Sequence, residues 1–435
     1  MRIAVYTLGC KVNQYESQAI CEQLSNRGHK IVPCSQQADA YIINSCTVTS
    51  MSDSKSKKAI GHLRKKNPNA VIALIGCFPQ AFPKKAEQIT DADIVVGNAN
   101  KSRVVELVEA FFADKQRRCE IKDFCSPATI EKMQITKFEE RTRAFVKIQD
   151  GCNRFCSYCI IPTARGRICS KPLEEIVSEV TELAKNGFSE IVLVGIDLSS
   201  YGRQFDKTLT DVVEAVSMIS GVKRIRLGSL EPEIISDEEL KRLSKIPAFC
   251  PQFHLSLQSG CDNTLKRMNR HYTADEYKTI VEKIRAVFKN ASITTDVMVG
   301  FAGESDEDFK ASLEFVKNIG FLKVHVFPYS RRSGTKADKF ADQIEGGEKK
   351  RRARVMLEET EMVRRKILNS QVGRIAGILV ESRTKNGQAF GYTEDYIPVC
   401  VESVSAPVGS VCKVKILSVS DDGCFVKGSL ISLEE

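Results

Sequence analysis

The chain has 435 residues, of which 42% are hydrophobic and 27% are charged, and its formal net charge is +9. These values are typical of a globular protein with two or three domains. No run approaches the roughly 18 to 20 apolar residues that span a bilayer, and the opening MRIAVYTLGCKVNQYES predicts a strand and a turn, not a signal peptide. We therefore expect a cytoplasmic protein with no membrane partner, whose sixteen cysteines stay reduced.

Short apolar runs alternate with amphipathic stretches in residues 1–115. Strands are predicted at 2–8, 40–46, 70–77 and 93–97, and helices near 14–27, 53–66 and 101–113. This alternation indicates a separate α/β domain of the flavodoxin type. A polar connector is predicted over residues 116–140.

The same alternation continues on a larger scale from residue 141 to 330. Strands are predicted at 143–149, 190–196, 224–230, 253–258, 293–301 and 323–329, with amphipathic helices near 172–187, 208–219, 237–245, 273–289 and 305–319. Six such strands favour a partial (βα)6 barrel over a doubly wound sheet, although the repeats leave both open. In either fold the active site lies at the carboxyl ends of the strands.

The last part of the chain is predicted to form a charged helix at 348–370 and a small β-barrel over 371–433. The predicted partial (βα)6 barrel and this charged helix together make a unit of residues 141–370. Residues 372–435 carry 6 basic and 8 acidic side chains, whereas residues 331–371 carry 12 and 7. The basic excess lies in the first part of the chain and in the short segment after residue 330, which suits contact with a polyanion, although a solvated helical face has the same pattern.

Three cysteines lie within eight residues directly after the first barrel strand, in QDGCNRFCSYCIIPTARGR. Cys152, Cys156 and Cys159 form a C-x3-C-x2-C array. Three thiolates can bind three irons of a [4Fe–4S] cube and leave the fourth iron open. The amino and carboxylate groups of S-adenosylmethionine can chelate that iron, and electron transfer then gives a 5′-deoxyadenosyl radical. A zinc knuckle is the alternative, but no His or second cysteine pair follows nearby.

Cys10, Cys46 and Cys77 each end a predicted strand of the first domain, in TLGC, INSC and LIGC. Loops that follow parallel strands gather at one edge of the sheet, so these three thiols can converge. From the pattern, a second metal site and three buried free thiols both remain open. The other ten cysteines show no such placement.

These motifs together resemble the radical-SAM methylthiotransferases along essentially the whole chain. The matching elements are LGCKVNQYES, NSCTVT, the GC at 76–77, GCNRFCSYCIIPTARGR, SLEP at 229–232, HLSLQSGCDNTLKRMNRHYT and DVMVGFAGESDEDF, followed by a segment like a TRAM domain. The resemblance implies that Cys10, Cys46 and Cys77 hold an auxiliary [4Fe–4S] cluster. It also implies that this cluster presents sulfur, while the cluster on Cys152, Cys156 and Cys159 generates the radical.

The segment LGCKVNQYES is most similar to the bacterial branch that modifies N6-threonylcarbamoyladenosine at position 37 of tRNA. The resemblance then implies a tRNA-modifying transferase that places a methylthio group on C2. It implies three partners: the tRNA anticodon loop, an electron donor of the flavodoxin or ferredoxin type, and a sulfur source. The alternatives are a methylthiotransferase for isopentenyladenosine-37 or for a ribosomal protein, or a non-catalytic iron–sulfur regulator that binds RNA.

The resemblance also indicates which residues contact S-adenosylmethionine. Tyr158 in the cysteine loop is expected near the adenine, and backbone near Val299 and Gly300 is expected to flank it. Glu231, Gln258 and Ser259 are expected at strand ends that face the cofactor. Each of these residues can instead have a capping or core role.

Overall fold

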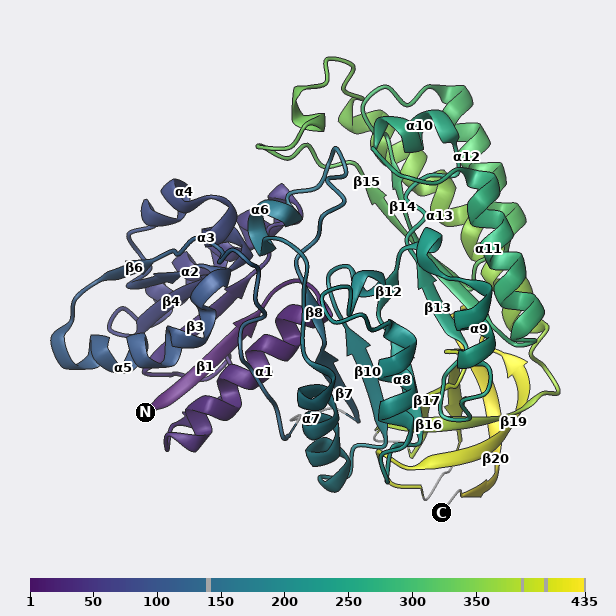
Figure 1. The fold of residues 1–435 in the computed structure, drawn as a ribbon, viewed down its shortest axis with the longest axis horizontal. Coiled ribbons are helices and arrows are strands. Elements are labelled where there is room, and N and C mark those ends of the chain that lie inside the picture. Colours follow the sequence, from purple (N-terminus) through teal and green to yellow (C-terminus); the bar gives the residue numbers. More distant parts are fainter. Residues whose placement is uncertain (138–141, 385–386, 403–405, 434–435) are drawn as a thin grey trace.

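The chain folds into three units that follow one another in sequence, coloured from purple to yellow in Figure 1. The computed structural model describes residues 1–137, 142–384, 387–402 and 406–433. The end of the predicted connector, 138–140, and residue 141 lie outside the described residues. None of the helices in these ranges combines the length and the apolar composition that crossing a bilayer requires.

The first unit is a six-stranded parallel sheet in the order β2-β1-β3-β4-β5-β6. The strands are β1 (Arg2–Thr7), β2 (Lys30–Ile31), β3 (Ala40–Ser45), β4 (Val71–Gly76), β5 (Ile94–Val96) and β6 (Arg118–Glu120). The helices are α1 (Lys11–Asn26), α2 (Ser50–Lys66), α3 (Cys77–Ala81), α4 (Pro83–Glu87) and α5 (Val104–Asp114). The flavodoxin-like prediction is confirmed.

The central strands of this sheet are buried along their whole length, because helices cover both faces. Strand β3 reads AYIINS and β4 reads VIALIG, and all twelve residues are buried. Helices α1 and α5 pack on one face, and α2, α3 and α4 pack on the other. Strand β6 lies within the stretch predicted as a connector. Its three residues, RCE, carry no apolar pattern, so the sequence gives no strand signal there.

The second unit contains the six predicted strands, all parallel, and they curve into a partial barrel. They are β7 (Arg143–Lys147), β10 (Glu190–Val194), β11 (Arg224–Leu227) with β12 (Ser229–Leu230), β13 (Gln252–Leu255), β14 (Ser292–Val299) and β15 (Lys323–Pro328). The predicted strand 224–230 divides at Gly228, where the ladder changes from β11-β10-β7 to β12-β13-β14-β15. The prediction of a partial barrel is confirmed.

Helices cover the outside of this partial barrel, as Figure 1 shows. The outer helices are α7 (Leu173–Lys185), α8 (Leu209–Ser217), α9 (Asp237–Leu243), α11 (Ala274–Val287) and α12 (Asp306–Ile319). Ser236 and Ser305 each accept a hydrogen bond from the third helical N–H and so cap α9 and α12. Shorter elements in the loops are β8 (Gln149–Asp150), α6 (Ile161–Arg165), β9 (Cys169–Ser170) and α10 (Asp262–Arg267).

The third unit is a closed five-stranded barrel in the order β16-β17-β18-β20-β19, which confirms the predicted small β-barrel. Helix α13 (Gly346–Asn369) leads into it, and its strands are β16 (Ile375–Arg383), β17 (Ala389–Thr393), β18 (Pro398–Val401), β19 (Val411–Val419) and β20 (Val426–Leu433). Arg226 in β11 donates hydrogen bonds to the carbonyls of Thr393 and Glu394. The small barrel is therefore anchored to the partial barrel.

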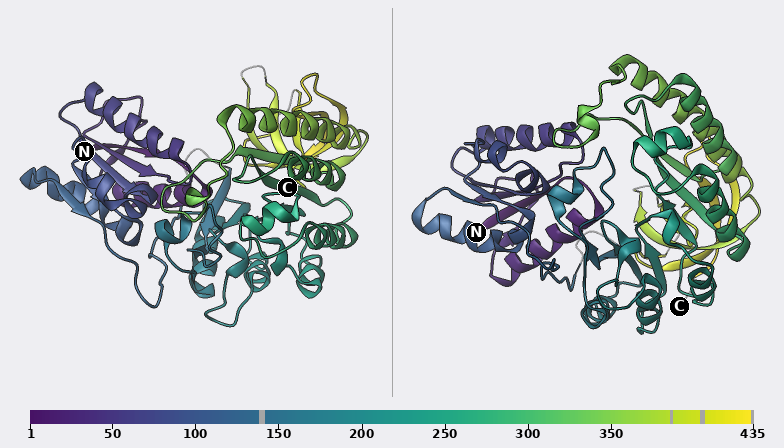
Figure 2. Two further views of the ribbon diagram at one scale, coloured as in Figure 1. Left: turned by 90° about the horizontal axis from the view of Figure 1, so that it is seen from above. Right: turned by 45° about the horizontal axis from the view of Figure 1, so that its top comes forward.

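One hydrophobic core extends from the first unit into the partial barrel. It joins residues of α1, such as Tyr15 and Ile20, to residues of β7 and β10, such as Phe145 and Ile191. Figure 2 shows the first unit seated against the open side of the partial barrel in both views. The strand ends of the two units are therefore held in a fixed relation.

Candidate functional site

The loop with Cys152, Cys156 and Cys159 is fixed by backbone hydrogen bonds at both ends. The amide of Cys152 donates to the carbonyl of Gly166 over 3.1 Å, and Ser157 donates to Met268 over 2.9 Å. Gly151 has φ +70°, and a Cβ there would lie 1.9 Å from the carbonyl oxygen of Arg167. A side chain at residue 151 therefore has no room, and glycine is required at the start of the loop.

Charged side chains of both signs lie near the three thiols of this loop. The Nη1 of Arg270 donates to the Sγ of Cys156 over 3.3 Å, and Arg270 also pairs with Glu231. Burial, together with neighbouring thiols, raises the pKa of the Cys152 and Cys159 thiols to about 12, and at Cys152 the carboxylates of Asp197 and Glu231 contribute to this rise. The thiolates therefore need a compensating positive charge, which a bound iron cluster supplies.

The other three cysteines converge as predicted, because β1, β3 and β4 are neighbours in the sheet. Cys46 follows β3 directly, Cys77 follows β4 directly, and Cys10 caps the start of α1 just after β1. A Cβ on Gly9 would lie 2.8 Å from the Cβ of Cys46 and 3.1 Å from its Sγ. Gly9 has φ +107°, so glycine both permits this turn and lets the two cysteine loops touch.

Polar side chains tie the loops of Cys10, Cys46 and Cys77 together. Asn13 donates to the carbonyls of Leu8 and Ser45, over 2.7 and 3.0 Å. The hydroxyl of Ser45 donates to the carbonyl of Ile75 over 2.6 Å and accepts from the amide of Phe78 over 3.2 Å. These bonds hold the three strand ends at one edge of the sheet.

The donor sets of both groups fit iron–sulfur clusters. Each group consists of three thiols and has side-chain N–H donors to sulfur: Arg270 to Cys156, and Asn98 to Cys77 over 3.3 Å. No three His, Cys, Asp or Glu side chains within the described ranges lie close enough to share a single metal ion. Thiolates of a cluster each bind a different iron, so they lie farther apart than the ligands of one ion.

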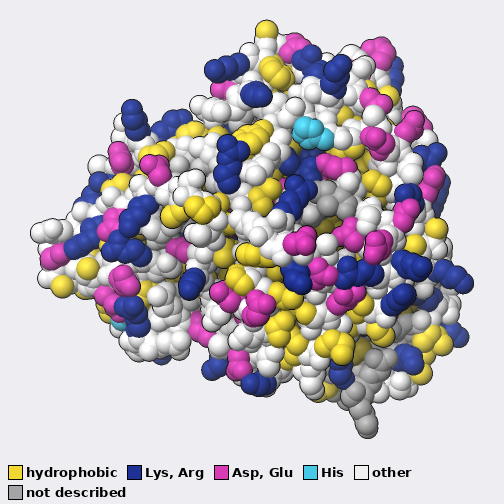
Figure 3. Space-filling view, viewed as in Figure 1, with side chains coloured by type: hydrophobic (Ala, Val, Ile, Leu, Met, Phe, Trp, Pro, Cys, Tyr) yellow, Lys and Arg dark blue, Asp and Glu magenta, His cyan; other side chains and the backbone are white. Residues whose placement is uncertain are grey.

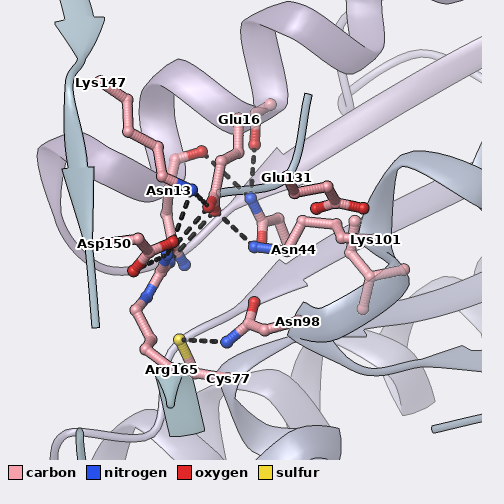
Figure 4. A network of polar contacts seen from close by, with 12 residues as sticks. Asn13, Glu16, Asn44, Cys77, Asn98, Lys101, Glu131, Lys147, Asp150 and Arg165 are labelled. Atoms are coloured by element: carbon pink, nitrogen blue, oxygen red, sulfur yellow. Dashed lines mark hydrogen bonds and ion pairs between the residues drawn. The ribbon is translucent and has the colours of Figure 1, made fainter. Parts of the chain in front are cut away.

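A buried network of charges joins the two cysteine groups, and Figure 4 shows it from close by. Glu16 in α1 accepts hydrogen bonds from Lys147 and Arg165, each over 2.8 Å, and pairs with Lys101. Arg165 also bonds Asp150, two residues before Cys152, over 3.0 Å. Burial alone would raise the pKa of Glu16, but these three cations hold it well below its usual range. The network therefore connects the helix after Cys10 to the loop of Cys152.

Replacing Glu16 by Ala should destabilise the protein by about 3 to 5 kcal/mol, because the change leaves three buried cations with one carboxylate fewer. The side chain of Glu16 is 2% exposed, so water cannot take the place of the carboxylate. The expected result is a lower urea midpoint for the first unfolding transition, measured by circular dichroism in the presence of a reductant.

The matched control for Glu16 is Glu109→Ala. Glu109 pairs with Arg27 over 2.8 Å and with the His29 ring over 2.9 Å near the surface, where the Arg27 and Glu109 side chains are about one third exposed. Exposed pairs contribute about 0.2 to 1 kcal/mol, so this variant should unfold almost like the parent. Equal midpoints for the two variants would show that the Glu16 network does not hold the two units together.

The residues expected to contact S-adenosylmethionine lie in two places, the cysteine loop with Glu231 and the ends of β13 and β14. Glu231 pairs with Arg270, which also bonds Cys156, and burial raises the pKa of Glu231. Tyr158 packs edge-on against Phe301, with ring centroids 6.3 Å apart. Both therefore lie at the cysteine loop.

The other four expected contacts lie at the ends of β13 and β14. Gln258 has φ +66°, and its amide donates to the carbonyl of Asp296 over 2.8 Å. Ser259 and Val299 are buried, at 0% and 1% exposed. The amide of Gly300 donates to Glu304 over 2.6 Å. In this conformation Ser259 has no accessible surface, and the Gly300 amide is bonded to the protein.

Sequence reasoning missed the charged residues that organise the site. Arg270, Glu16 and Arg165 lie inside quoted motifs, RMNRHYT, KVNQYES and TARGR, and this is the signal that could have singled them out. Asp197 accepts from Ser200 over 2.8 Å and lies 3.9 Å from the Sγ of Cys152.

On the face shown in Figure 3, Lys and Arg are mixed with Asp and Glu instead of forming one patch.

Three families match successive parts of the chain. The Radical SAM superfamily matches residues 146–316, Uncharacterized protein family UPF0004 matches residues 2–97, and the TRAM domain matches residues 369–426. The chain is 37% identical to the threonylcarbamoyladenosine tRNA methylthiotransferase MtaB of Thermotoga maritima, over 97% of this chain and 95% of that protein. It is 34% identical to a tRNA-2-methylthio-N(6)-dimethylallyladenosine synthase of Dictyoglomus thermophilum, over 95% of each.

Among solved structures, the fold is similar to the radical S-adenosylmethionine methyltransferase TsrM of Kitasatospora setae. The TM-score is 0.54 at 12% identity, over 75% of this chain and 72% of that one. This likeness concerns the fold alone. The order of the three matching families and the full-length similarity to curated enzymes agree with the two groups of strand-end cysteines, and this chain belongs to the radical-SAM methylthiotransferase family.

Proposed function

We propose that this protein places a methylthio group on C2 of N6-threonylcarbamoyladenosine at position 37 of tRNA. The observation that carries the proposal is the pair of three-thiol groups, one at the strand ends of each α/β unit, joined through the buried Glu16–Arg165 contact. An aromatic C2–H is neither acidic nor readily displaced by a thiolate. The reaction therefore calls for both a radical and a sulfur donor, and two separate thiol groups can hold them.

In this proposal the two groups hold one [4Fe–4S] cluster each. Cys152, Cys156 and Cys159 hold the cluster that binds S-adenosylmethionine, and Cys10, Cys46 and Cys77 hold the auxiliary cluster. Together with S-adenosylmethionine, the clusters supply the 5′-deoxyadenosyl radical and the sulfur that becomes methylthio. The chain supplies the fixed distance between the groups, through the shared core and the buried charges.

The side chains at the cysteine loop orient the bound cofactor. Arg270 holds Glu231 beside Cys156, where the carboxylate can accept a hydrogen bond from the ribose or the amino group. The ring of Tyr158 offers a face to the adenine. The proposed cofactor contacts remain Tyr158, Glu231, Gln258, Ser259, Val299 and Gly300, and a contact at Ser259, which has no accessible surface here, requires the loop after β13 to shift. Because the amide of Gly300 is bonded to Glu304, any contact by Gly300 is through its carbonyl.

Recognition of the tRNA anticodon loop is assigned to the small barrel and the helix before it. The expected domain bounds of 1–115, a connector 116–140, 141–370 and 371–433 are kept with one change: β6 pairs with β5, so the first domain extends to residue 120 and the connector begins at 121. An unpaired loop adenosine can enter the site without loss of a Watson–Crick partner. The electron donor, of the flavodoxin or ferredoxin type, and the sulfur source are further proposed partners in the cytoplasm.

The test is mass spectrometry of tRNA nucleosides from a strain that lacks the gene, with and without the gene returned. The expected result is loss of the 2-methylthio derivative of threonylcarbamoyladenosine and its return on complementation. Loss of the 2-methylthio isopentenyl nucleoside instead would assign the protein to the other tRNA branch. The related enzymes include both kinds, so this measurement decides the nucleoside.

A non-catalytic iron–sulfur regulator that binds RNA is the alternative class. A regulator needs no cofactor site at the cysteine loop, so formation of 5′-deoxyadenosine by the reconstituted protein would exclude it. Absence of this product together with tight, redox-dependent RNA binding would favour it.

A further inference from the structure

The lumen of the partial barrel holds a cavity with a volume of about 750 Å³. All six barrel strands contribute to its wall, and Tyr392 and Tyr396 of the small barrel close one end. The first unit contributes one residue to the wall, Lys11, which directly follows Cys10. A ligand in the lumen can therefore contact both the partial barrel and Lys11, the residue that follows Cys10 of the auxiliary group.

The wall of this lumen is strongly cationic. Its charged residues are Lys11, Arg143, Arg226, Lys323, Arg364 and a single acid, Asp296. Three of these cations form ion pairs with acids of the protein. Arg143 pairs with Glu381 over 3.0 Å, Arg226 with Glu190 over 2.7 Å, and Arg364 with Glu361 over 2.7 Å. The carboxylate of Asp296 lies 3.4 Å from His254.

The two lysines of the wall, Lys11 and Lys323, form no such ion pair among the described residues. Within the described residues, neither the Lys11 nor the Lys323 ammonium has a hydrogen-bond or ion-pair partner. An ammonium group in a cavity filled by a hydrocarbon ligand would lose hydration without compensation. A ligand with a carboxylate would replace that hydration by a charge-assisted hydrogen bond. The lumen therefore favours an anionic ligand over a purely apolar one.

The chemistry of the proposed substrate matches this wall. A threonylcarbamoyl group ends in a free carboxylate and carries a hydroxyl, whereas a dimethylallyl group is a hydrocarbon. N6 is attached to C6, and C6 and C2 flank N1 on the same ring. A base that presents C2 to the auxiliary site therefore brings its N6 substituent close to the residue after Cys10.

We propose that Lys11 binds the carboxylate of the N6-threonylcarbamoyl group in the lumen, with Lys323 as a second cationic contact, and so selects this nucleoside over N6-alkyl adenosines. The proposal rests on the proposed function, because it names the part of that substrate which the lumen recognises. Arg143 and Arg226, which are already bound to acids, shape the wall and do not take the carboxylate.

The test is equilibrium binding of two anticodon stem-loop RNAs of identical sequence to the full-length, reconstituted protein. One RNA carries threonylcarbamoyladenosine at position 37 and the other carries adenosine. The Lys11→Gln variant should bind the modified RNA about tenfold to a hundredfold more weakly, the range expected for a hydrogen bond to a charged group. Its affinity for the unmodified RNA should equal that of the parent.

Three further variants complete the test. Lys11→Arg keeps the charge and should retain most of the preference for the modified RNA over the unmodified RNA. Lys323→Gln should lose part of this preference. The matched control is Lys310→Gln, an exposed lysine on α12 away from the lumen, which should bind both RNAs like the parent. Iron analysis of the Lys11→Gln variant shows whether the neighbouring Cys10 still holds its cluster. If the iron content of this variant falls, the Lys323→Gln variant provides the test.

Equal weakening for both RNAs would show that Lys11 contacts a phosphate and would overturn the proposal. Unchanged binding of both RNAs by Lys11→Gln and Lys323→Gln would overturn it as well. These outcomes differ from failure of the proposed function. If only the role of Lys11 is wrong, the parent protein still forms the 2-methylthio threonylcarbamoyl nucleoside. If the proposed function is wrong, the parent protein does not form it.

Discussion

Replacing Cys152, Cys156 and Cys159 together by Ala will leave about four irons per chain instead of about eight, and will abolish cleavage of S-adenosylmethionine. The reason is that these thiols are the proposed ligands of the cluster to which the cofactor binds. Their charged neighbours Arg154 and Arg270 carry guanidinium groups, which have no lone pair to offer iron. The measurements are iron analysis after anaerobic reconstitution and chromatography of 5′-deoxyadenosine.

The matched control for this variant removes three cysteines that lie on the surface. Cys119, Cys125 and Cys424 are exposed and belong to neither group. Their joint replacement by Ala should leave iron content and cofactor cleavage unchanged. If instead the first triple variant still forms 5′-deoxyadenosine, the radical site lies elsewhere in the chain.

The strand-end position of the cysteines could be predicted because buried parallel strands have a clear sequence signal. Strands β3 and β4 each contain a run of at least four successive apolar residues, and each strand is followed at once by a cysteine. The same signal placed the three-cysteine loop after the first barrel strand. The topology then follows from the rule that neighbouring parallel strands end at one edge.

The residues that join the two groups could not be predicted in this way. Glu16 and Arg165 are 149 positions apart, and charged residues on helices usually face water. Arg165 also lies in a five-residue helix that has no periodicity to indicate a buried face. Only the packing of the first unit against the partial barrel brings these side chains together, and sequence spacing carries no information about that packing.

Lys11 illustrates the same limit at the lumen. A lysine at the start of a helix, beside a cysteine, reads as an ordinary solvated residue. Its importance depends on the partial barrel being open toward the first unit, so that a residue after β1 becomes part of the wall of a cavity built mainly from β7 to β15. The sequence predicts both units but does not predict which side of one faces the other.

Replacing Cys10, Cys46 and Cys77 together by Ala should give the opposite pattern to the first triple variant. Reductive formation of 5′-deoxyadenosine is expected to continue, because the loop of Cys152 is fixed by Gly166 and Met268 and not by these cysteines. Formation of the 2-methylthio nucleoside is expected to fall below detection, because the proposed sulfur donor is missing. Iron content should again be about four per chain.

This prediction separates a sulfur-donating cluster from a structural one. A structural cluster would, on removal, unfold the first unit, weaken RNA binding and expose the shared core, so that both reactions would fail together. A sulfur donor would leave cofactor cleavage and RNA binding intact, because phosphate contacts, base stacking and the proposed Lys11 contact supply the affinity and none of them needs the cluster. The paired assay therefore compares 5′-deoxyadenosine, 2-methylthio nucleoside and RNA affinity on one preparation. Normal amounts of 2-methylthio product would return these three cysteines to the role of buried thiols at the end of a sheet.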